Sequence, residues 1–95
     1  MSSPLCLSDS ELSAALAVLP GWAVDNGQLV HERRFPAYMD GIRFAAAAGE
    51  AAERMNHHPD ILIQWRKVLL SIYTHSAGGL TVLDIAFAGE VNRIL

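Results

Sequence analysis

The most chemically distinctive segment is "ERMNHHPD", residues 53–60, which contains two adjacent histidines. An imidazole has an unperturbed pKa of about 6.5, so His57 and His58 could both take up and release protons near neutral pH. Glu53 precedes His57 by four residues, which on a helix lets the carboxylate orient the imidazole. The alternative is an ordinary surface pair and two solvated histidines at a helix end. The segment therefore predicts either an acid/base site or a simple helix terminus.

Metal binding is a third possibility for the double histidine. A catalytic zinc site usually takes three ligands from a rigid frame, with spacings such as His-x-x-x-His. Pro59 disfavours a helical conformation at His58, so the two adjacent imidazoles should point in different directions. Only His75 could complete a ligand set. The spacing therefore favours proton transfer over metal binding.

Two residues outside this segment could take part in the same chemistry. His75 follows a predicted strand and precedes the turn "SAGG", a position at which loops commonly carry function. The alternative to a functional role for His75 is a partly exposed histidine at a strand end. We adopt this non-functional interpretation outright for His31, which lies in an otherwise charged strand. Asp84 also has a structural alternative, because Thr81 and Asp84 have the N-cap and N3 spacing of a capping box.

Hydrophobic periodicity and turn residues predict the elements that must position these side chains. Ser8 and Glu11 have capping-box spacing, and Asn26-Gly27 is typical of a type I′ hairpin turn. In chain order we first expect a short helix after Ser8 that stops at Pro20-Gly21, and then strands at 22–25 and 28–35. A long helix should follow from Pro36 and close at His57. Two strands separated by a break at 65–67 and a helix from Thr81 should complete the chain. Hairpins imply antiparallel pairing, so the fold class is α+β.

Composition limits the classes of protein to consider. The 95 residues are enough for a single domain, 1–95, and 52% of them are hydrophobic. The net charge of −3, with only seven Lys and Arg, argues against direct nucleic-acid binding. The single cysteine, Cys6, suits a reducing, cytoplasmic compartment, and we find no signal peptide and no apolar run of about 18 residues for a membrane span. The small core and the small-residue segment "AAAAGEAA" predict a homo-oligomer packed through sheet edges or helices.

Beyond these patterns, the chain resembles the pterin-4a-carbinolamine dehydratase family over nearly its whole length. The resemblance rests on "ERMNHHPD", on Trp65 and on "THSAGGLTVLD". The residues that match the family pattern are Glu53, His57, His58, Pro59, Trp65, His75 and Asp84. The chain departs from the pattern at Arg33, where an apolar residue is common, and at 61–63, which is more aliphatic than usual.

The resemblance implies a four-stranded antiparallel sheet with three helices packed on one face, in the order α-β-β-α-β-β-α. It also implies a 4a-hydroxytetrahydrobiopterin dehydratase, which eliminates water from 4a-hydroxytetrahydropterin to give quinonoid dihydropterin. That reaction recycles tetrahydrobiopterin after an aromatic amino acid hydroxylase and needs no metal or bound cofactor. A homodimer and a homotetramer both stay open.

The resemblance further implies roles for individual residues. His57 and His75 take the acid/base roles, although sequence does not assign which is the acid and which the base. His58 binds substrate beside them and shares the proton transfer, while Glu53 and Asp84 orient the imidazoles. Trp22 flanks the pterin ring, and Pro59 completes the substrate-binding set.

The main alternative is a non-catalytic protein of the same fold. Members of this fold also serve as a dimerising transcription cofactor, and relatives assist the assembly of another enzyme without dehydratase chemistry. An intact histidine set distinguishes the enzyme from these scaffolds. Since this chain carries all three histidines, the sequence favours the dehydratase.

Overall fold

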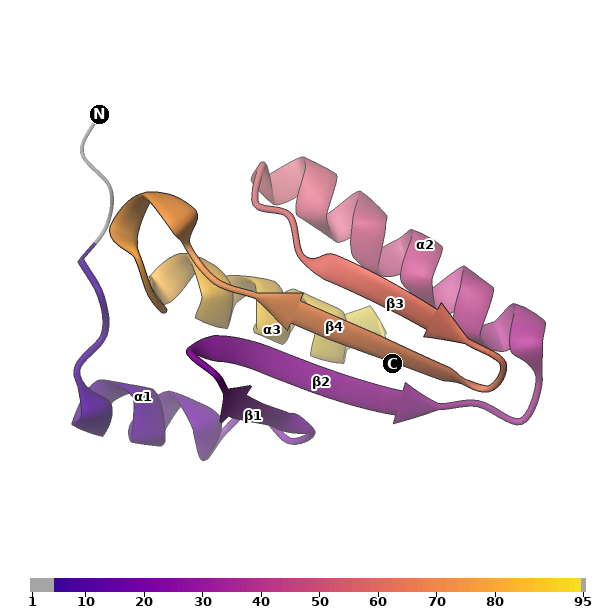
Figure 1. Ribbon diagram of the computed structural model, residues 1–95, viewed down its shortest axis with the longest axis horizontal. Coiled ribbons are helices and arrows are strands. Elements are labelled where there is room, and N and C mark those ends of the chain that lie inside the picture. Colours follow the sequence, from indigo (N-terminus) through magenta and orange to yellow (C-terminus); the bar gives the residue numbers. More distant parts are fainter. Residues whose placement is uncertain (1–4, 95) are drawn as a thin grey trace.

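The computed structural model describes residues 5–94, which fold as an alternation of helices and strand pairs (Figure 1). The elements are α1 (Asp9–Leu16), β1 (Trp22–Asp25), β2 (Gln28–Arg34), α2 (Tyr38–Met55), β3 (Asp60–Gln64), β4 (Lys67–Ile72), the 3-10 turn η1 (His75–Ala77) and α3 (Val82–Ile94). The predicted order is confirmed, and so is the break between the third and fourth strands.

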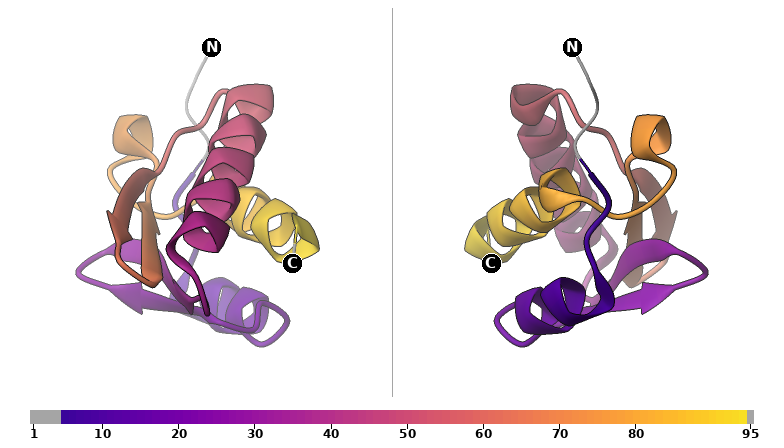
Figure 2. Two further views of the ribbon diagram at one scale, coloured as in Figure 1. Left: turned by 90° about the vertical axis from the view of Figure 1, so that its right-hand side faces the viewer. Right: turned by 90° about the vertical axis from the view of Figure 1, so that its left-hand side faces the viewer.

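The four strands form one sheet in the order β1-β2-β4-β3, with every neighbouring pair antiparallel. Trp22 pairs with His31 across the first hairpin, and Leu69 of β4 lies between Glu32 of β2 and Leu62 of β3. The three helices cover the same face of this sheet (Figure 2). The α+β class and the one-sided helix layer are therefore confirmed, and β1 and β3 form the two edges.

Local signals at two turns agree with the structure. Asn26 and Gly27 have φ values of 52° and 76°, the pair of left-handed residues that a type I′ turn requires. At the start of α1, Ser8 Oγ accepts from the Glu11 backbone N–H at 3.2 Å, and the Ser8 N–H donates to Glu11 Oε1 at 2.8 Å. The hydrogen bond from the Ser8 N–H, and to a smaller extent the Ser8 side chain, lower the pKa of the Glu11 carboxyl. The predicted capping box is confirmed.

The core lies between the sheet and the helices α2 and α3. On β4, Val68, Leu70 and Ile72 face inward and are almost fully buried, as the strand alternation predicts. Phe87 of α3 is completely buried against them. Much of the small-residue segment of α2 also belongs to this core, because Ala45, Ala48, Ala51 and Ala52 are buried. The small side chains let α2 approach the sheet closely.

His31 corrects the sequence interpretation of a partly exposed strand histidine, because the residue is only 4% exposed. Strand alternation places it on the inner face with Leu29, where it stacks on Trp22 with ring centroids 4.9 Å apart. Its Nδ1 lies 2.7 Å from the Gly21 carbonyl oxygen. Burial lowers the pKa of His31, partly opposed by the Gly21 hydrogen bond. A Cβ at Gly21 would lie 2.8 Å from His31 Cε1, so this contact requires glycine.

No helix between residues 5 and 94 is both long enough and apolar enough to cross a lipid bilayer.

Candidate active site

The three predicted site histidines line one hollow of about 450 Å³ between the end of α2 and the η1 turn. Its walls are Asn56, His57, His58, Tyr73, Thr74, His75, Ser76 and Leu83. A larger groove, of about 640 Å³, runs between α2 and β3 and includes His58 but neither His57 nor His75. Because acid/base chemistry needs the histidines together, we assign the candidate site to the smaller hollow.

His57 is held by a buried carboxylate. Its Nε2 lies 2.6 Å from Oδ1 of Asp84, which stands in the first turn of α3 and is completely buried. The His57 side chain keeps 12% of its surface exposed, on the side that lines the hollow. The carboxylate of Asp84 is thus in place to hold this imidazole, which is the role that the family resemblance implies for it.

The second oxygen of Asp84 is also fully engaged. Oδ2 accepts hydrogen bonds from the Thr81 backbone N–H and from the Thr74 hydroxyl, each at 2.9 Å. The bond from Thr81 is the one that a capping box requires, because it joins the N-cap backbone to the N3 side chain. The two interpretations of Asp84 are thus compatible: one oxygen caps the helix and the other contacts His57.

Glu53 does not orient His57, which corrects the predicted pair. Its Oε1 lies 3.2 Å from Nε2 of His58 instead. The reason is the end of α2: the helix stops at Met55, two residues before the predicted end, and Asn56 turns the chain with φ 51° and ψ 43°. His57 therefore lies beyond the helix and is not on the Glu53 face. Both side chains of the Glu53–His58 pair are largely exposed, so solvent screens this interaction.

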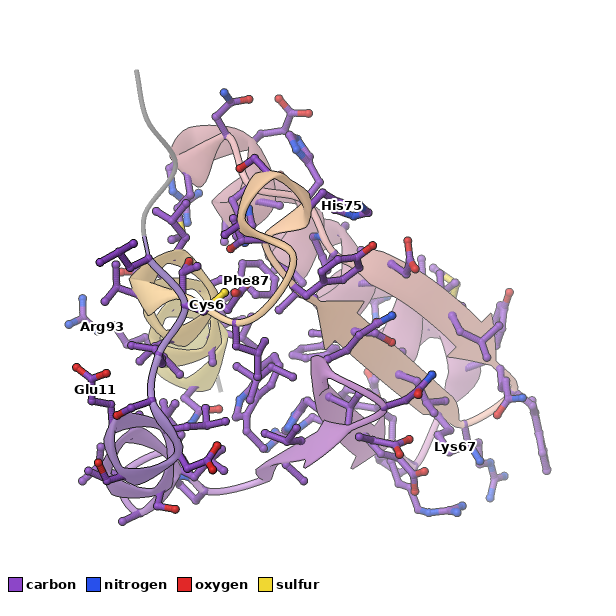
Figure 3. All side chains as sticks on the ribbon, turned by 60° about the vertical axis from the view of Figure 1, so that its left-hand side comes forward. Cys6, Glu11, Lys67, His75, Phe87 and Arg93 are labelled. Carbon is purple, nitrogen blue, oxygen red and sulfur yellow. The ribbon has the colours of Figure 1, made fainter. Side chains whose placement is uncertain are left out.

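His75 reaches the hollow from the opposite side. It begins the 3-10 turn η1, three positions after the end of β4, and its exposed ring packs against Tyr73 at a tilt of 32°, with centroids 4.1 Å apart. Figure 3 shows His75 on the outer side of this turn, away from the buried Phe87. An isolated bridge between Thr74 and Gly79 closes the loop. Two separate chain segments therefore bring His57 and His75 to one hollow.

The structure does not bring Trp22 or Pro59 to the lining of this hollow. Trp22 is only 7% exposed, and its Nε1 donates to Oδ1 of Asn92 at 3.0 Å. The pairing of β1 with β2 turns the indole into the core. There it contacts α3 near the end of the helix that is opposite to Asp84. Pro59 lines the neighbouring groove beside His58. Within this single chain, neither residue stands beside the His57–Asp84 pair.

Sequence analysis missed two contributors to the site. Thr74 donates to Asp84, and Tyr73 packs against His75. Their only sequence signal is that both lie within the two positions before His75. Their contacts require the tertiary fold, which brings the end of β4 next to the start of α3.

The arrangement can carry protons through His57. Asp84, as a carboxylate, can only accept hydrogen bonds, so the neutral imidazole must carry its hydrogen on Nε2. Nδ1 then carries the free lone pair of the ring. Neutral His57 can therefore accept a proton at Nδ1, and protonated His57 can donate one there. Across the same residues, no group of three histidine, cysteine or acidic side chains has the arrangement of a metal site.

Fold and site together define an α+β domain with a carboxylate-supported histidine site that is suited to acid/base catalysis. Comparison with known proteins extends this description. The family model described as pterin 4 alpha carbinolamine dehydratase matches residues 6–94. This chain therefore belongs to the pterin-4a-carbinolamine dehydratase family, whose enzymes are hydro-lyases.

Individual relatives agree with this assignment. A protein of Mycolicibacterium smegmatis, provisionally named as a pterin-4-alpha-carbinolamine dehydratase, is 46% identical over 94% of this chain and 95% of its own length. A Mycobacterium tuberculosis protein with the same provisional name is 43% identical over 93% and 94%. The crystal structure of a transcriptional coactivator/pterin dehydratase from Brucella melitensis superimposes with a TM-score of 0.88. It is 34% identical and covers 94% of this chain and 97% of that one.

Proposed function

We propose that this protein is a 4a-hydroxytetrahydrobiopterin dehydratase that works by histidine acid/base catalysis. The observation that carries the proposal is the His57–Asp84 hydrogen bond of 2.6 Å at the wall of a hollow that His75 also lines. A supported imidazole and a second one in the same cavity provide two groups for two proton transfers. Membership of the dehydratase family supports pterin as the substrate class.

The reaction removes water across the C4a–N5 bond of 4a-hydroxytetrahydropterin. One group protonates the departing C4a hydroxyl, and another takes the proton from N5. The C4a–O bond breaks, the C4a–N5 double bond of the quinonoid dihydropterin forms, and one water leaves. His57 can act at Nδ1 in either direction, and His75 is free to meet the substrate from the other wall. No redox step and no additional reactant is needed.

His58 and Glu53 take supporting roles in this proposal. His58 lines the hollow next to His57 and offers a further hydrogen-bonding group to the substrate. Glu53 holds the His58 ring from the solvent side at 3.2 Å. Because both side chains are largely exposed, their contribution is smaller than that of the buried Asp84–His57 pair.

We further propose that the chain acts as a homodimer or homotetramer in the cytoplasm and serves an aromatic amino acid hydroxylase that produces its substrate. Strand β3 supports the oligomer, because it is an edge strand and carries the exposed side chains Leu62 and Ile63. An exposed apolar edge of this kind invites pairing with another chain.

The relative from Brucella melitensis is named both as a coactivator and as a dehydratase, which keeps a scaffold function as the second candidate for this fold. The complete histidine set favours the enzyme here. An assay with chemically generated 4a-hydroxytetrahydropterin separates the two candidates. We expect the purified protein to accelerate water loss well above the rate in buffer, whereas a pure scaffold would leave that rate unchanged.

A further inference from the structure

Two buried threonine hydroxyls lie behind the Asp84 carboxylate. Thr74, directly before η1, is 3% exposed, and Thr81, directly before α3, is completely buried. Their Oγ1 atoms are 2.8 Å apart, and Thr74 Oγ1 lies 2.9 Å from Asp84 Oδ2. The hydroxyls therefore form a continuous chain of hydrogen bonds that reaches His57 through Asp84.

Only one direction of donation satisfies every contact in this chain. The carboxylate of Asp84 accepts, so the Thr74 hydroxyl hydrogen points to Oδ2. Thr74 has no second hydrogen, so Thr81 must donate to Thr74. Thr81 Oγ1 in turn accepts from the Leu83 backbone N–H at 3.2 Å. Each hydroxyl thus donates once, and every donor points toward Asp84.

The direction of these hydrogen bonds affects His57. Two donors, the Thr74 hydroxyl and the Thr81 N–H, fix Oδ2 and so hold the plane of the Asp84 carboxylate. Oδ1 is then presented to Nε2 of His57 as an acceptor. A fixed acceptor at one ring nitrogen selects the tautomer and the orientation of an imidazole. Thr74 also precedes His75, and its N–H donates to the Gly79 carbonyl at 3.0 Å.

We propose that Thr74 is a positioning residue for the dehydration reaction. Its hydroxyl, acting through Asp84, holds neutral His57 with the hydrogen on Nε2 and the lone pair of Nδ1 facing the hollow. Because Thr74 is anchored in the loop that carries His75, it also ties the two histidines into one rigid unit. This inference rests on the proposed function for its catalytic part, whereas the tautomer can be measured without substrate.

The first test is the tautomer of His57, measured by nitrogen-15 NMR of the imidazoles at about pH 8, above the ordinary histidine range. Loss of signals in His57→Gln identifies the ring. We expect the wild type to show the Nε2–H tautomer, Thr74→Val to show a mixture, and Thr74→Ser to match the wild type. Ser71→Ala, which removes a hydroxyl from the outer face of β4, is the matched control and should also match it. A wild-type ring protonated on Nδ1 would overturn the proposal without any variant.

The second test is kinetic. Loss of a hydrogen bond to a charged group should lower kcat of Thr74→Val roughly tenfold and change KM by less than about twofold, with recovery in Thr74→Ser. An unchanged tautomer or an unchanged kcat in folded Thr74→Val contradicts the positioning role. Should Thr74→Val fail to fold, Thr74→Cys replaces it, because a thiol is a much weaker donor. A wild type without dehydratase activity would refute the proposed function, while the tautomer result would still decide the role of Thr74 toward His57.

Discussion

Nε2 of His57 and Oδ1 of Asp84 are 2.6 Å apart, although 27 positions separate the two residues in the chain. The end of α2 delivers the imidazole and the first turn of α3 delivers the carboxylate, so packing of these two helices creates the pair. Asp84 is completely buried and its three hydrogen-bond donors come from His57, Thr74 and Thr81. Both oxygens of Asp84 are therefore hydrogen-bonded, and its contact with His57 involves Nε2 and not Nδ1.

Replacement of Asp84 by Asn tests the support of His57. The amide can no longer accept at both positions, so one buried donor loses its partner and the His57 tautomer is no longer fixed. We expect kcat to fall roughly a hundredfold and the free energy of unfolding to drop by about 1–3 kcal/mol. Steady-state kinetics and urea denaturation measure the two effects. Asp25→Asn, at the exposed end of β1, is the control; equal losses in both variants would contradict a specific role for Asp84.

Glu53→Gln should have a much smaller effect than Asp84→Asn. The Glu53–His58 pair is largely exposed, and such pairs contribute about 0–1 kcal/mol. We expect kcat to fall by no more than about threefold, because His58 keeps its place at the hollow without this partner. The same dehydration assay measures the kcat of this variant. A loss as large as that of Asp84→Asn would show that Glu53 supports His57 after all.

Stability should depend on pH through His31. Burial lowers the folded-state pKa of this imidazole, so between its folded and unfolded pKa values the unfolded chain binds more protons. The free energy of unfolding should therefore decrease as pH falls through about 6.5 toward the lower folded value. Denaturation at a series of pH values from about 7.5 to about 5.5 measures this slope.

The matched variant is His31→Phe, which keeps an aromatic ring against Trp22 but cannot titrate. Its stability should vary less with pH over the same range than that of the wild type. Identical pH profiles for the two proteins would contradict the contribution of His31.

Association in solution should depend on the edge strand β3. Light scattering at micromolar concentration should give the mass of a dimer or tetramer. Leu62→Lys places a charge on the exposed edge, which disfavours strand pairing, and should shift the protein toward the monomer. Val18→Lys, at an exposed site after α1, should not. A monomeric wild type would refute the oligomer.

Most of the fold could be predicted because its signals are local. Ser8 with Glu11, and Asn26 with Gly27, specify their own backbone conformations through hydrogen bonds or allowed dihedral angles. The histidine set and Asp84 could be named from their spacing and from the family resemblance. Local signals do not require knowledge of distant partners, so they can be recognised in the sequence alone.

What could not be predicted depends on tertiary contacts. The left-handed turn at Asn56 rotates His57 away from Glu53, so a simple helical projection gave the wrong pair. His31 follows the strand alternation, but its charged neighbours concealed its burial. The Thr74 hydroxyl reaches Asp84 only because the chain that follows β4 lies beside the start of α3.

Whether His57 and His75 catalyse the reaction can be decided by measuring the dehydration of 4a-hydroxytetrahydropterin by the wild type, His57→Ala and His75→Ala side by side. We expect a wild type clearly faster than buffer and a loss of roughly a hundredfold or more in each variant, with the fold intact by circular dichroism. A wild type no faster than buffer would contradict the enzyme. Two folded variants with wild-type rates would contradict the histidine mechanism.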